Sequence, residues 1–374
     1  MAADTLCQTP YGDFRLLRYP SRRDEPLLAW CAADLLLLEA LHSREVDPGQ
    51  VLVVNDDHGA LCVALQARAL WTDSALAVLA LQRNLQQNDR AEVPVVWSTE
   101  APAAGQDPVA LRIPKQLPYF EYQLALLASL LEPGATLLAA GMDKHLSPRV
   151  VELLEHHIGP TRRHRGERKA RLFSSIRDDR PAAPVPAPSS YYCDAVGGEL
   201  RALPNVFSRD KLDGGSRLLL QQLPALGPAT TLLDLACGNG VLGLAAFRAG
   251  LAPAVVFVDE SAMAVASARV NSAGLFPGDA SAFTFGQGDG LANYRGPQAD
   301  LILCNPPFHL QHTVDDYAGR RLLEQCALHL QPGGRLCLVA NQHLDYLPTL
   351  KRLFQRVDRL ARDRRFIVWL ARRG

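Results

Sequence analysis

The chain has 374 residues, and at roughly 100–200 residues per domain this length predicts two or three domains. Hydrophobic residues make up 48% of the chain and charged residues 21%, which excludes a wholly disordered protein. The 39 basic and 39 acidic side chains give a net charge of zero. A polycation that coats nucleic acid is therefore excluded, and any acidic partner must meet a local basic patch.

The most apolar stretch, residues 27–41, is interrupted by Asp34 and Glu39, which argues against a membrane span. The N-terminus has no basic segment followed by an apolar core, so we expect no secretory signal and a cytoplasmic protein. The eight cysteines are scattered and form no CxxC pair. This spacing indicates neither a zinc site nor a disulfide framework, and no metal is expected.

A basic run and a proline-rich stretch divide the chain in the middle. Residues 162–171 hold six Lys or Arg, and residues 178–190 hold four prolines. Four prolines in a short stretch cannot continue a helix or a central strand, and they favour extended polyproline geometry. We therefore expect one domain at residues 1–177, a semi-rigid linker at 178–190 and a second domain at 191–374.

Strand-like and helix-like segments alternate on both sides of this linker, which predicts parallel sheets with helices on both faces. Residues 69–84 resemble residues 255–271 once one residue is skipped, and residues 132–146 resemble residues 331–344. All βαβ units look somewhat alike, but ordered matches favour duplication of one α/β domain.

A glycine-rich turn follows the strand-like segment 231–235 and leads into a helix. Its glycines let the backbone turn sharply and let a ligand approach closely, and the helix start offers free N–H groups. Asp259 ends the next strand, 19 residues after Gly240, where it can accept hydrogen bonds from ribose hydroxyls. The G-x-G-x-x-G spacing also fits a nicotinamide dinucleotide, but Asp234, four residues before Gly238, suits a cationic amine better than a pyrophosphate. A tight turn without a ligand is the other alternative.

A second loop, Asn-Pro-Pro-Phe-His at residues 305–309, follows the buried strand at residues 300–304. In a doubly wound sheet this loop lies at the carboxyl edge, beside the glycine loop, where ligands bind. The two prolines fix the backbone and lack N–H groups, so the turn presents mainly acceptors. A proline-rich turn that only caps the strand is the alternative interpretation.

Such a loop suits the methylation of an amine whose lone pair is delocalised into a ring or a carbonyl. The side-chain oxygen of Asn305 and the carbonyl of Pro306 can each accept one amine hydrogen, which aligns the nitrogen with an electrophilic methyl group. Fixed acceptors also stabilise the positive charge that grows on the nitrogen. Phe308 can stack on a flat group such as a nucleobase rotated out of its helix.

These motifs, in this order, resemble those of the class I S-adenosylmethionine-dependent methyltransferases with an Asn-Pro-Pro-aromatic loop. The resemblance implies that S-adenosylmethionine is the cofactor, that the glycine loop holds its methionine part, that Asp259 holds the ribose and that Asp289 contacts the adenine. It implies the cofactor-binding residues Asp234, Cys237, Gly238, Asn239, Gly240, Asp259, Glu260, Asp289 and Asn305, and the catalytic residues Asn305, Pro306, Pro307 and Phe308. Ala236 departs from the pattern, because glycine is common at its position.

The resemblance narrows to the ribosomal RNA guanine-N2 methyltransferases, through the Asn-Pro-Pro-Phe-His loop, residues 207–216 and an inactive first copy of the domain. Residues 309–312 and 340–346 are more similar to the large-subunit members, which implies methyl transfer to N2 of guanine 1835 in 23S rRNA. The open alternatives are a 16S rRNA guanine-N2 methyltransferase, a protein-glutamine or DNA-adenine methyltransferase, and a non-catalytic RNA-binding assembly protein.

The first copy lacks the features of the second. Residues 51–60 stand in the place of the glycine loop with one glycine and several bulky or charged residues, which predicts that close approach of a cofactor is blocked. Residues 111–115, Leu-Arg-Ile-Pro-Lys, stand where the Asn-Pro-Pro-Phe motif would be. We expect two tandem Rossmann-like class I methyltransferase domains, the first degenerate and left with an RNA-binding role.

Two basic segments flank the second domain. Residues 162–171 carry six Lys or Arg and one Glu, which gives a local charge of +5. Residues 351–374 carry nine Lys or Arg and two Asp, which gives a local charge of +7. Phosphate binding needs such concentrated charge, so ribosomal RNA is the expected partner. The alternative interpretation is that these two segments are a solvated helix face and an arginine-rich tail that bind no RNA.

Overall fold

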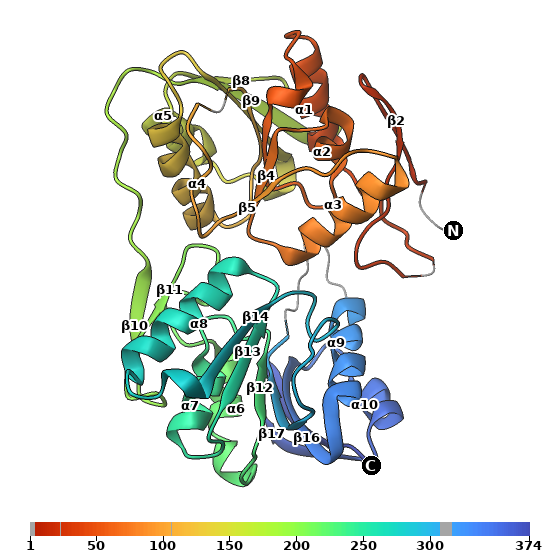
Figure 1. The fold of residues 1–374 in the computed structure, drawn as a ribbon, viewed down its shortest axis with the longest axis vertical. Helices are drawn as coiled ribbons and strands as arrows, with labels where there is room; N and C mark the ends of the chain where they lie inside the picture. The colour runs from red at the N-terminus through yellow and green to blue at the C-terminus, as the bar shows by residue number, and fades with distance from the viewer. Residues whose placement is uncertain (1–3, 23, 106, 307–315) are drawn as a thin grey trace. The chain divides into compact units, whose positions relative to one another are not determined.

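A computed structural model describes residues 4–22, 24–105, 107–306 and 316–374 (Figure 1). The chain divides into two compact units, Met1–Ala187 and Pro188–Gly374. Each unit contains one seven-stranded sheet and one two-stranded hairpin. Within the described residues, no helix combines the length and apolar character needed to cross a bilayer.

The first unit follows the expected alternation of strands and helices. Its strands are β1 (Leu6–Thr9), β2 (Gly12–Arg15), β3 (Leu52–Val54), β4 (Ala69–Thr72), β5 (Val95–Trp97), β6 (Val109–Arg112), β7 (Thr136–Met142), β8 (Thr161–Arg163) and β9 (Ala170–Ile176). Its helices are α1 (Ala32–His42), α2 (Ala60–Leu65), α3 (Ala75–Gln87), α4 (Leu117–Leu130) and α5 (Val150–His157), with short 3-10 turns at Pro48–Gln50 and Asp143–His145.

The second unit repeats this order. Its strands are β10 (Ser189–Cys193), β11 (Gly198–Ala202), β12 (Leu232–Leu235), β13 (Val255–Asp259), β14 (Phe283–Gln287), β15 (Ala299–Cys304), β16 (Leu330–Asn341), β17 (Arg356–Arg362) and β18 (Phe366–Arg372). Its helices are α6 (Gly214–Leu220), α7 (Val241–Arg248), α8 (Ala262–Leu275), α9 (Asp316–His329) and α10 (Leu347–Leu353), with 3-10 turns at Leu223–Ala225 and Ala280–Ala282. Because β10 begins at Ser189, the proline-rich stretch ends in a strand.

The two large sheets have the same topology. Their strand orders are β5-β4-β3-β6-β7-β9-β8 and β14-β13-β12-β15-β16-β18-β17. In the second unit β14, β13, β12, β15 and β16 pair in parallel, and β18 runs antiparallel to β16 and β17. The first unit repeats these directions strand for strand. The predicted fold, two Rossmann-like domains in tandem, is confirmed.

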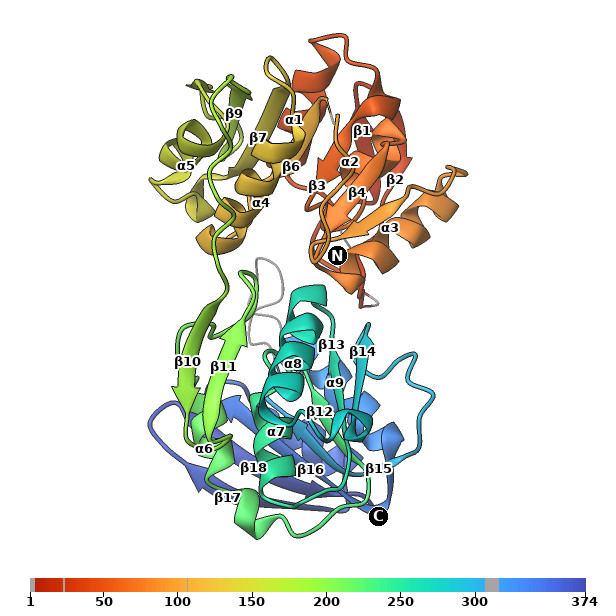
Figure 2. The same cartoon turned by 60° about the vertical axis from the view of Figure 1, so that its left-hand side comes forward.

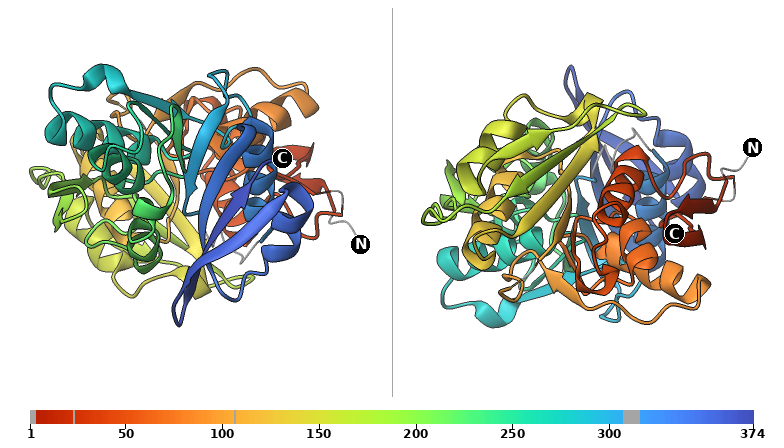
Figure 3. Two further views of the ribbon diagram at one scale, coloured as in Figure 1. Left: turned by 90° about the horizontal axis from the view of Figure 1, so that it is seen from below. Right: turned by 90° about the horizontal axis from the view of Figure 1, so that it is seen from above.

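Helices cover both faces of each large sheet, as the turned views show (Figures 2 and 3). In the second unit α6, α7 and α8 bury apolar side chains against one face, and α9 and α10 bury theirs against the other. In the first unit α1, α2 and α3 cover one face and α4 and α5 the other. Strands buried on both faces explain the nearly continuous apolar runs in the sequence.

A buried asparagine ties each hairpin to its unit. Asn271 on α8 accepts a hydrogen bond from the N–H of Arg201 at 2.8 Å and donates one to its carbonyl at 2.8 Å. In the first unit Asn84 on α3 makes the same pair of hydrogen bonds with Leu17, two residues after β2, at 2.9 Å and 2.9 Å. The hairpins are therefore part of the duplication, which sequence patterns did not predict.

Strand register corrects the sequence comparison between the two copies. Leu235 pairs with Val258 in one sheet and Val54 with Trp71 in the other, so Thr72 stands directly in the place of Asp259 and no residue needs to be skipped. Most residues of the two basic segments lie on strands and turns, whereas the alternative interpretation was a helix face and a tail. The first lies on β8, β9 and the turn between them, and the second on α10, β17 and β18.

Candidate active site

The carboxyl ends of three central strands bring the predicted loops together. Leu235 on β12 lies between Val258 on β13 and Cys304 on β15, in parallel register. The glycine loop, Asp259 and Asn305 therefore leave the sheet side by side. This is the edge at which open α/β sheets bind ligands.

The glycine loop turns through left-handed backbone at three positions. Ala236 has φ +57°, Gly238 +56° and Gly240 +84°, and Gly240 is the N-cap of α7. A Cβ atom added at Gly238 would meet nothing within 4 Å, so the backbone here borders open space. The loop therefore has the exposed peptide surface that a closely approaching ligand requires.

Asp234 lies beneath this loop and is fully buried. One carboxylate oxygen accepts a hydrogen bond from the N–H of Gly243 at 2.8 Å, and Oδ1 has no hydrogen-bond partner among the described residues. Burial raises the pKa of Asp234 well above its usual range; the Gly243 bond lowers it, and the charge of Asp259 raises it further. An unsatisfied buried carboxylate oxygen favours a ligand that carries positive charge.

Asp259 holds the loop from the neighbouring strand. Its Oδ2 accepts a hydrogen bond from the N–H of Gly238 at 2.9 Å, and its Oδ1 accepts one from the N–H of Ser261 at 3.0 Å. Glu260 follows it, with a carbonyl that accepts a hydrogen bond from Gln287 at 3.2 Å. The half-buried Asp259 thus stands where the sequence analysis puts the ribose acid.

Two further loop residues are turned toward the protein. Asn239 donates a hydrogen bond to the hydroxyl of Tyr191 at 3.2 Å, and its carbonyl accepts one from Asn271 at 2.9 Å. Cys237 is buried, and burial raises the pKa of its thiol well above its usual range. These two side chains support the loop from within the protein, so these residues have only their backbone groups to offer to a ligand.

Asn305 is held in one orientation by α6. Its amide nitrogen donates to Asp213 Oδ2 at 3.1 Å and to Ser216 Oγ at 2.9 Å. Both amide hydrogens are thereby used, which fixes which end of the side chain is the oxygen. Asn305 Oδ1 is buried and has no hydrogen-bond partner among the described residues. The side chain presents an acceptor, as the sequence analysis requires.

The rest of the second loop is described only in part. Pro306 is buried directly after Asn305. Pro307 and Phe308, which the sequence analysis makes part of the catalytic loop, lie outside the described residues, as do His309 and His312.

Asp289 lies beyond the end of β14, where Gly288 donates a hydrogen bond to the carbonyl of Asp259 at 3.0 Å. Its buried carboxylate forms a two-pronged ion pair with Arg321 of α9. The acid proposed for the adenine is therefore near the ribose acid but engaged with a cation that sequence reasoning did not find.

Asp213 and Ser216 are the other site residues that sequence reasoning missed. They lie about 90 positions before Asn305, in a segment that the resemblance had marked without assigning roles. Asp213 is also the N-cap of α6 and accepts a hydrogen bond from the N–H of Ser216 at 3.0 Å. The signal available in the sequence was the N-cap pattern, which predicts a helix start but not its contact with Asn305.

S-adenosylmethionine fits the donor and acceptor set at this edge. The open space at Gly238 admits close backbone contact, Asp234 Oδ1 offers an unused buried acceptor for an ammonium group, and Asp259 is placed for hydroxyls. Within the described residues there is no group of three His, Cys, Asp or Glu arranged to hold a metal ion. A doubly wound domain with this loop defines a class I methyltransferase.

Comparisons with known proteins agree with this class. The RLMG N-terminal domain model matches residues 4–179, and the methyltransferase small domain model matches residues 197–370. The fold is similar to that of T. thermophilus 16S rRNA N2 G1207 methyltransferase in complex with AdoMet and guanosine, with a TM-score of 0.78 and 24% identity over 99% of this chain and 98% of that one.

Relatives at higher identity cover the whole chain. It is 42% identical to ribosomal RNA large subunit methyltransferase G of Stutzerimonas stutzeri, over 97% of this chain and 98% of that protein. It is 41% identical to the protein of that name from Pseudomonas aeruginosa, over 97% of this chain and 98% of that protein. The chain belongs to the ribosomal RNA large subunit methyltransferase G family, as the sequence resemblance predicted.

Proposed function

We propose that this chain transfers a methyl group from S-adenosylmethionine to the exocyclic N2 of a guanine in 23S rRNA, with guanine 1835 as the target position. The observation that carries the proposal is Asn305, whose amide hydrogens are both bound to α6 while its buried oxygen is left for an amine hydrogen. The names of the relatives support the large subunit over the small subunit.

The 2-amino group of guanine is a weak nucleophile because its lone pair is delocalised into the ring. Asn305 Oδ1 and the Pro306 carbonyl would each accept one amine hydrogen and so fix the direction of the lone pair. As the nitrogen–carbon bond forms, positive charge grows on the nitrogen, and these acceptors stabilise it without reorganising. The nearby Asp213 carboxylate polarises Asn305 through its amide and adds to this effect.

S-adenosylmethionine supplies an electrophilic methyl group on a sulfonium when it is bound. Asp234 would hold its ammonium group, the backbone of Gly238 and Gly240 would border its methionine part, and Asp259 would hold its ribose hydroxyls. Asp289 would contact the adenine while Arg321 fixes the position of that carboxylate.

The first unit and the basic strands would supply most contacts to the RNA. Exposed arginines on β8 and β17 give sequence-independent affinity for phosphates, and the first unit would bind RNA without binding the cofactor. We place this reaction in the cytoplasm, where ribosomal RNA is made and assembled in bacteria.

The test is to map methylated guanines in rRNA from cells with and without this protein. Loss of one N2-methylguanine at position 1835 of 23S rRNA is the expected result, and loss of a 16S rRNA methyl group instead would overturn the assignment.

A variant tests the role of the asparagine. Asn305→Ala should lower kcat by at least about a hundredfold, the scale seen when one preorganised hydrogen-bond partner of a transition state is removed. Cofactor affinity measured by calorimetry should change by less than about threefold, since Asn305 faces the amine. Loss of both activity and cofactor binding would mean that Asn305 supports the fold instead.

A further inference from the structure

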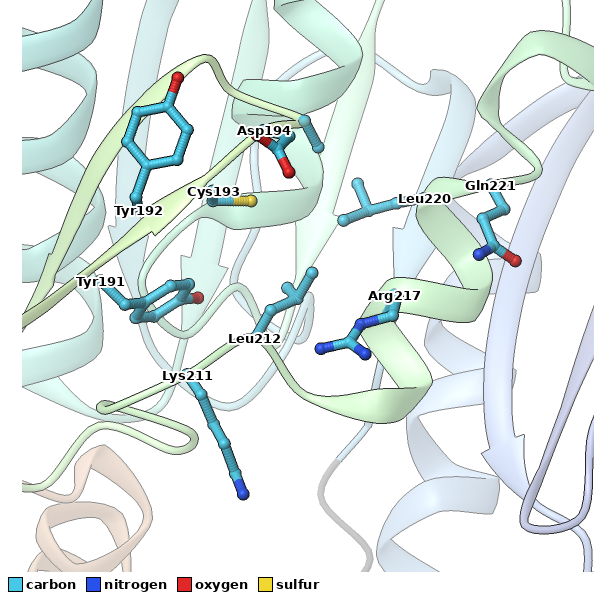
Figure 4. Close-up of a pocket in the computed structure, with 10 residues that line it drawn as sticks. Tyr191, Tyr192, Cys193, Asp194, Lys211, Leu212, Arg217, Leu220 and Gln221 are labelled. Atoms are coloured by element: carbon cyan, nitrogen blue, oxygen red, sulfur yellow. The ribbon is translucent and has the colours of Figure 1, made fainter.

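A cavity of about 530 Å³ lies in the second unit between β10 and α6 (Figure 4). This volume is within the range of roughly 300–1,000 Å³ that is typical of small-ligand sites. One wall is formed by residues 191–195 of the hairpin and the other by residues 211–212, 217 and 220–221. None of these residues is part of the cofactor site described above.

The cavity contains two cations that no acid neutralises. Lys211 and Arg217 are exposed, and within the described part of the chain neither side chain makes an ion pair or a hydrogen bond. In Figure 4 the Lys211 ammonium and the Arg217 guanidinium lie toward one end, and Asp194, the acid of the lining, lies at the other. Two unpaired cations beside a cavity favour an anionic group such as a phosphate.

The hairpin also carries an exposed aromatic ring at the end of the cavity away from these cations. Tyr192 lines the cavity and is 68% exposed, which is high for a large aromatic side chain. In Figure 4 its ring turns away from Lys211 and Arg217 and lies on the side of Asp194, so it does not offer a stacking surface beside the two cations.

Two residues link the walls of the cavity to the proposed methylation site. Tyr191 on its wall accepts the hydrogen bond from Asn239 of the cofactor loop. Asp213, which holds Asn305, lies between Lys211 and Arg217 in the chain and caps the helix that carries Arg217. A nucleotide in the cavity would therefore be a neighbour of the base whose amine faces Asn305.

The first unit shows that these cations are not needed by the fold. Helix α1 packs against the large sheet of the first unit as α6 packs against that of the second. The N-cap of α1 is Cys31, and that of α6 is Asp213. Counting from these caps, Lys211 corresponds to Ala29, and Arg217 to Leu35. Ala29 is buried, and Leu35 packs against the apolar core of that unit. The charges thus occur in the copy that has the intact glycine loop and are missing from the degenerate copy.

From these observations we infer that the cavity between β10 and α6 binds a single-stranded RNA nucleotide next to the target guanine, with its phosphate on Lys211 and Arg217. This inference rests on the proposed function and names the part of the catalytic unit that positions the substrate.

The test uses the full-length chain, a 23S rRNA fragment that contains the target guanine, and labelled S-adenosylmethionine. For Lys211→Ala/Arg217→Ala, the KM for RNA should rise about tenfold, while kcat and the KM for S-adenosylmethionine change less than about twofold. The dependence of log KM on log salt should become shallower by about one per lost phosphate contact.

Arg201→Ala is the matched control, because Arg201 is an exposed cation of the same hairpin that does not line the cavity. A double variant whose KM for RNA equals that of the control overturns the inference. A rise in the KM for S-adenosylmethionine instead assigns the cavity to the cofactor and also overturns it. Failure of the wild-type chain to methylate any rRNA would instead refute the proposed function. In that case, anisotropy with a single-stranded oligoribonucleotide still decides whether the cavity binds RNA.

Discussion

Both units begin a helix with glycine after the first central strand, Gly59 at φ +83° and Gly240 at φ +84°. Two residues earlier the second unit has Gly238 facing open space, where the first unit has Asp57. The duplicated backbone is therefore conserved in shape while the surface offered to a ligand is not.

The start of the loop helix is held by different carboxylates in the two units. In the second unit Asp234 on the strand accepts the N–H of Gly243, and in the first unit Val53 stands at the position of Asp234. There Asp56 of the loop caps the helix by accepting the N–H groups of Gly59, Leu61 and Cys62 at 2.8–2.9 Å. Asp56 thus accepts the hydrogen bonds of the free N–H groups at the start of the helix, so no ligand is needed to accept them.

The second loop diverges in the same way. Arg112, the last residue of β6, stands at the position of Asn305, and it forms a buried ion pair with Asp34 of α1. Asp34 stands at the position of Ser216, three residues after the N-cap. The first unit thus has a buried ion pair where the second has an amide held by two hydrogen bonds, with one acceptor left unused among the described residues. The comparison teaches that the two copies share a backbone but differ in the acceptors that they leave at this edge. Asp234 Oδ1 and Asn305 Oδ1 have no hydrogen-bond partner among the described residues, and Val53 and Arg112 stand in their places.

The strongest test is to copy the first unit into the second. Asn305→Arg/Ser216→Asp should fold, because the same pair is tolerated in the first unit, and kcat should fall by at least about a thousandfold because the acceptor is replaced by a donor. Methyl transfer to rRNA with labelled cofactor measures this, with cofactor affinity as the control. A double variant that keeps more than a tenth of the wild-type activity would contradict the role given to Asn305.

The reverse test breaks the charge pair of the first unit. Arg112→Leu leaves the Asp34 carboxylate buried without its cation, which should lower the free energy of unfolding by about 3–5 kcal/mol. Denaturant titration measures this loss, and kcat of the folded protein should stay within about twofold. The control is Arg112→Leu/Asp34→Leu, which removes both charges and should recover most of the loss. Equal destabilisation by single and double variants would show that the pair itself is not what matters.

The third test closes the open space of the glycine loop. Gly238→Asp copies Asp57 of the first unit and should weaken cofactor binding about a hundredfold, because it fills the approach and places a negative charge there. Gly250→Asp is matched in backbone, with φ +69° and no atom within 4 Å of an added Cβ, but it lies after α7 and away from the loop. Calorimetry of both variants separates the two effects. Equal loss of affinity would point to backbone strain.

The smallest expected effect concerns the charge of Asp234. Asp234→Asn should weaken cofactor binding about tenfold, since an amide cannot neutralise an ammonium group. Because the pKa of Asp234 is raised in the free protein, binding of a cation favours its ionised form and releases a proton. The affinity of the wild-type protein for the cofactor should thus increase as the pH rises toward the pKa of Asp234 in the free protein. This pH dependence should be absent in the Asp234→Asn variant. Calorimetry in buffers of different ionisation enthalpy counts this proton, and equal proton release by both proteins would contradict the assignment.

The sequence predicted the fold and the place of the site because both depend on local patterns. Apolar runs, the glycine turn and the order of Asp234, Asp259 and Asn305 are visible along the chain. The partners Asp213, Ser216 and Arg321 could not be predicted, since each contact joins residues 32 or more positions apart and depends on how a helix packs. The hairpins were missed because short strands outside the large sheet have no strong periodic signal.

Asn271 joins two parts of the second unit to which we assign different ligands, RNA for the hairpin and the cofactor for the glycine loop. Its side chain binds the backbone of Arg201 in the hairpin and the carbonyl of Asn239 in the glycine loop. If binding of one ligand orders its segment, the cost of ordering the other segment falls, and linkage makes this advantage mutual. The two substrates of the enzyme should accordingly bind with positive cooperativity, and the small carboxamide of a single asparagine would set its size.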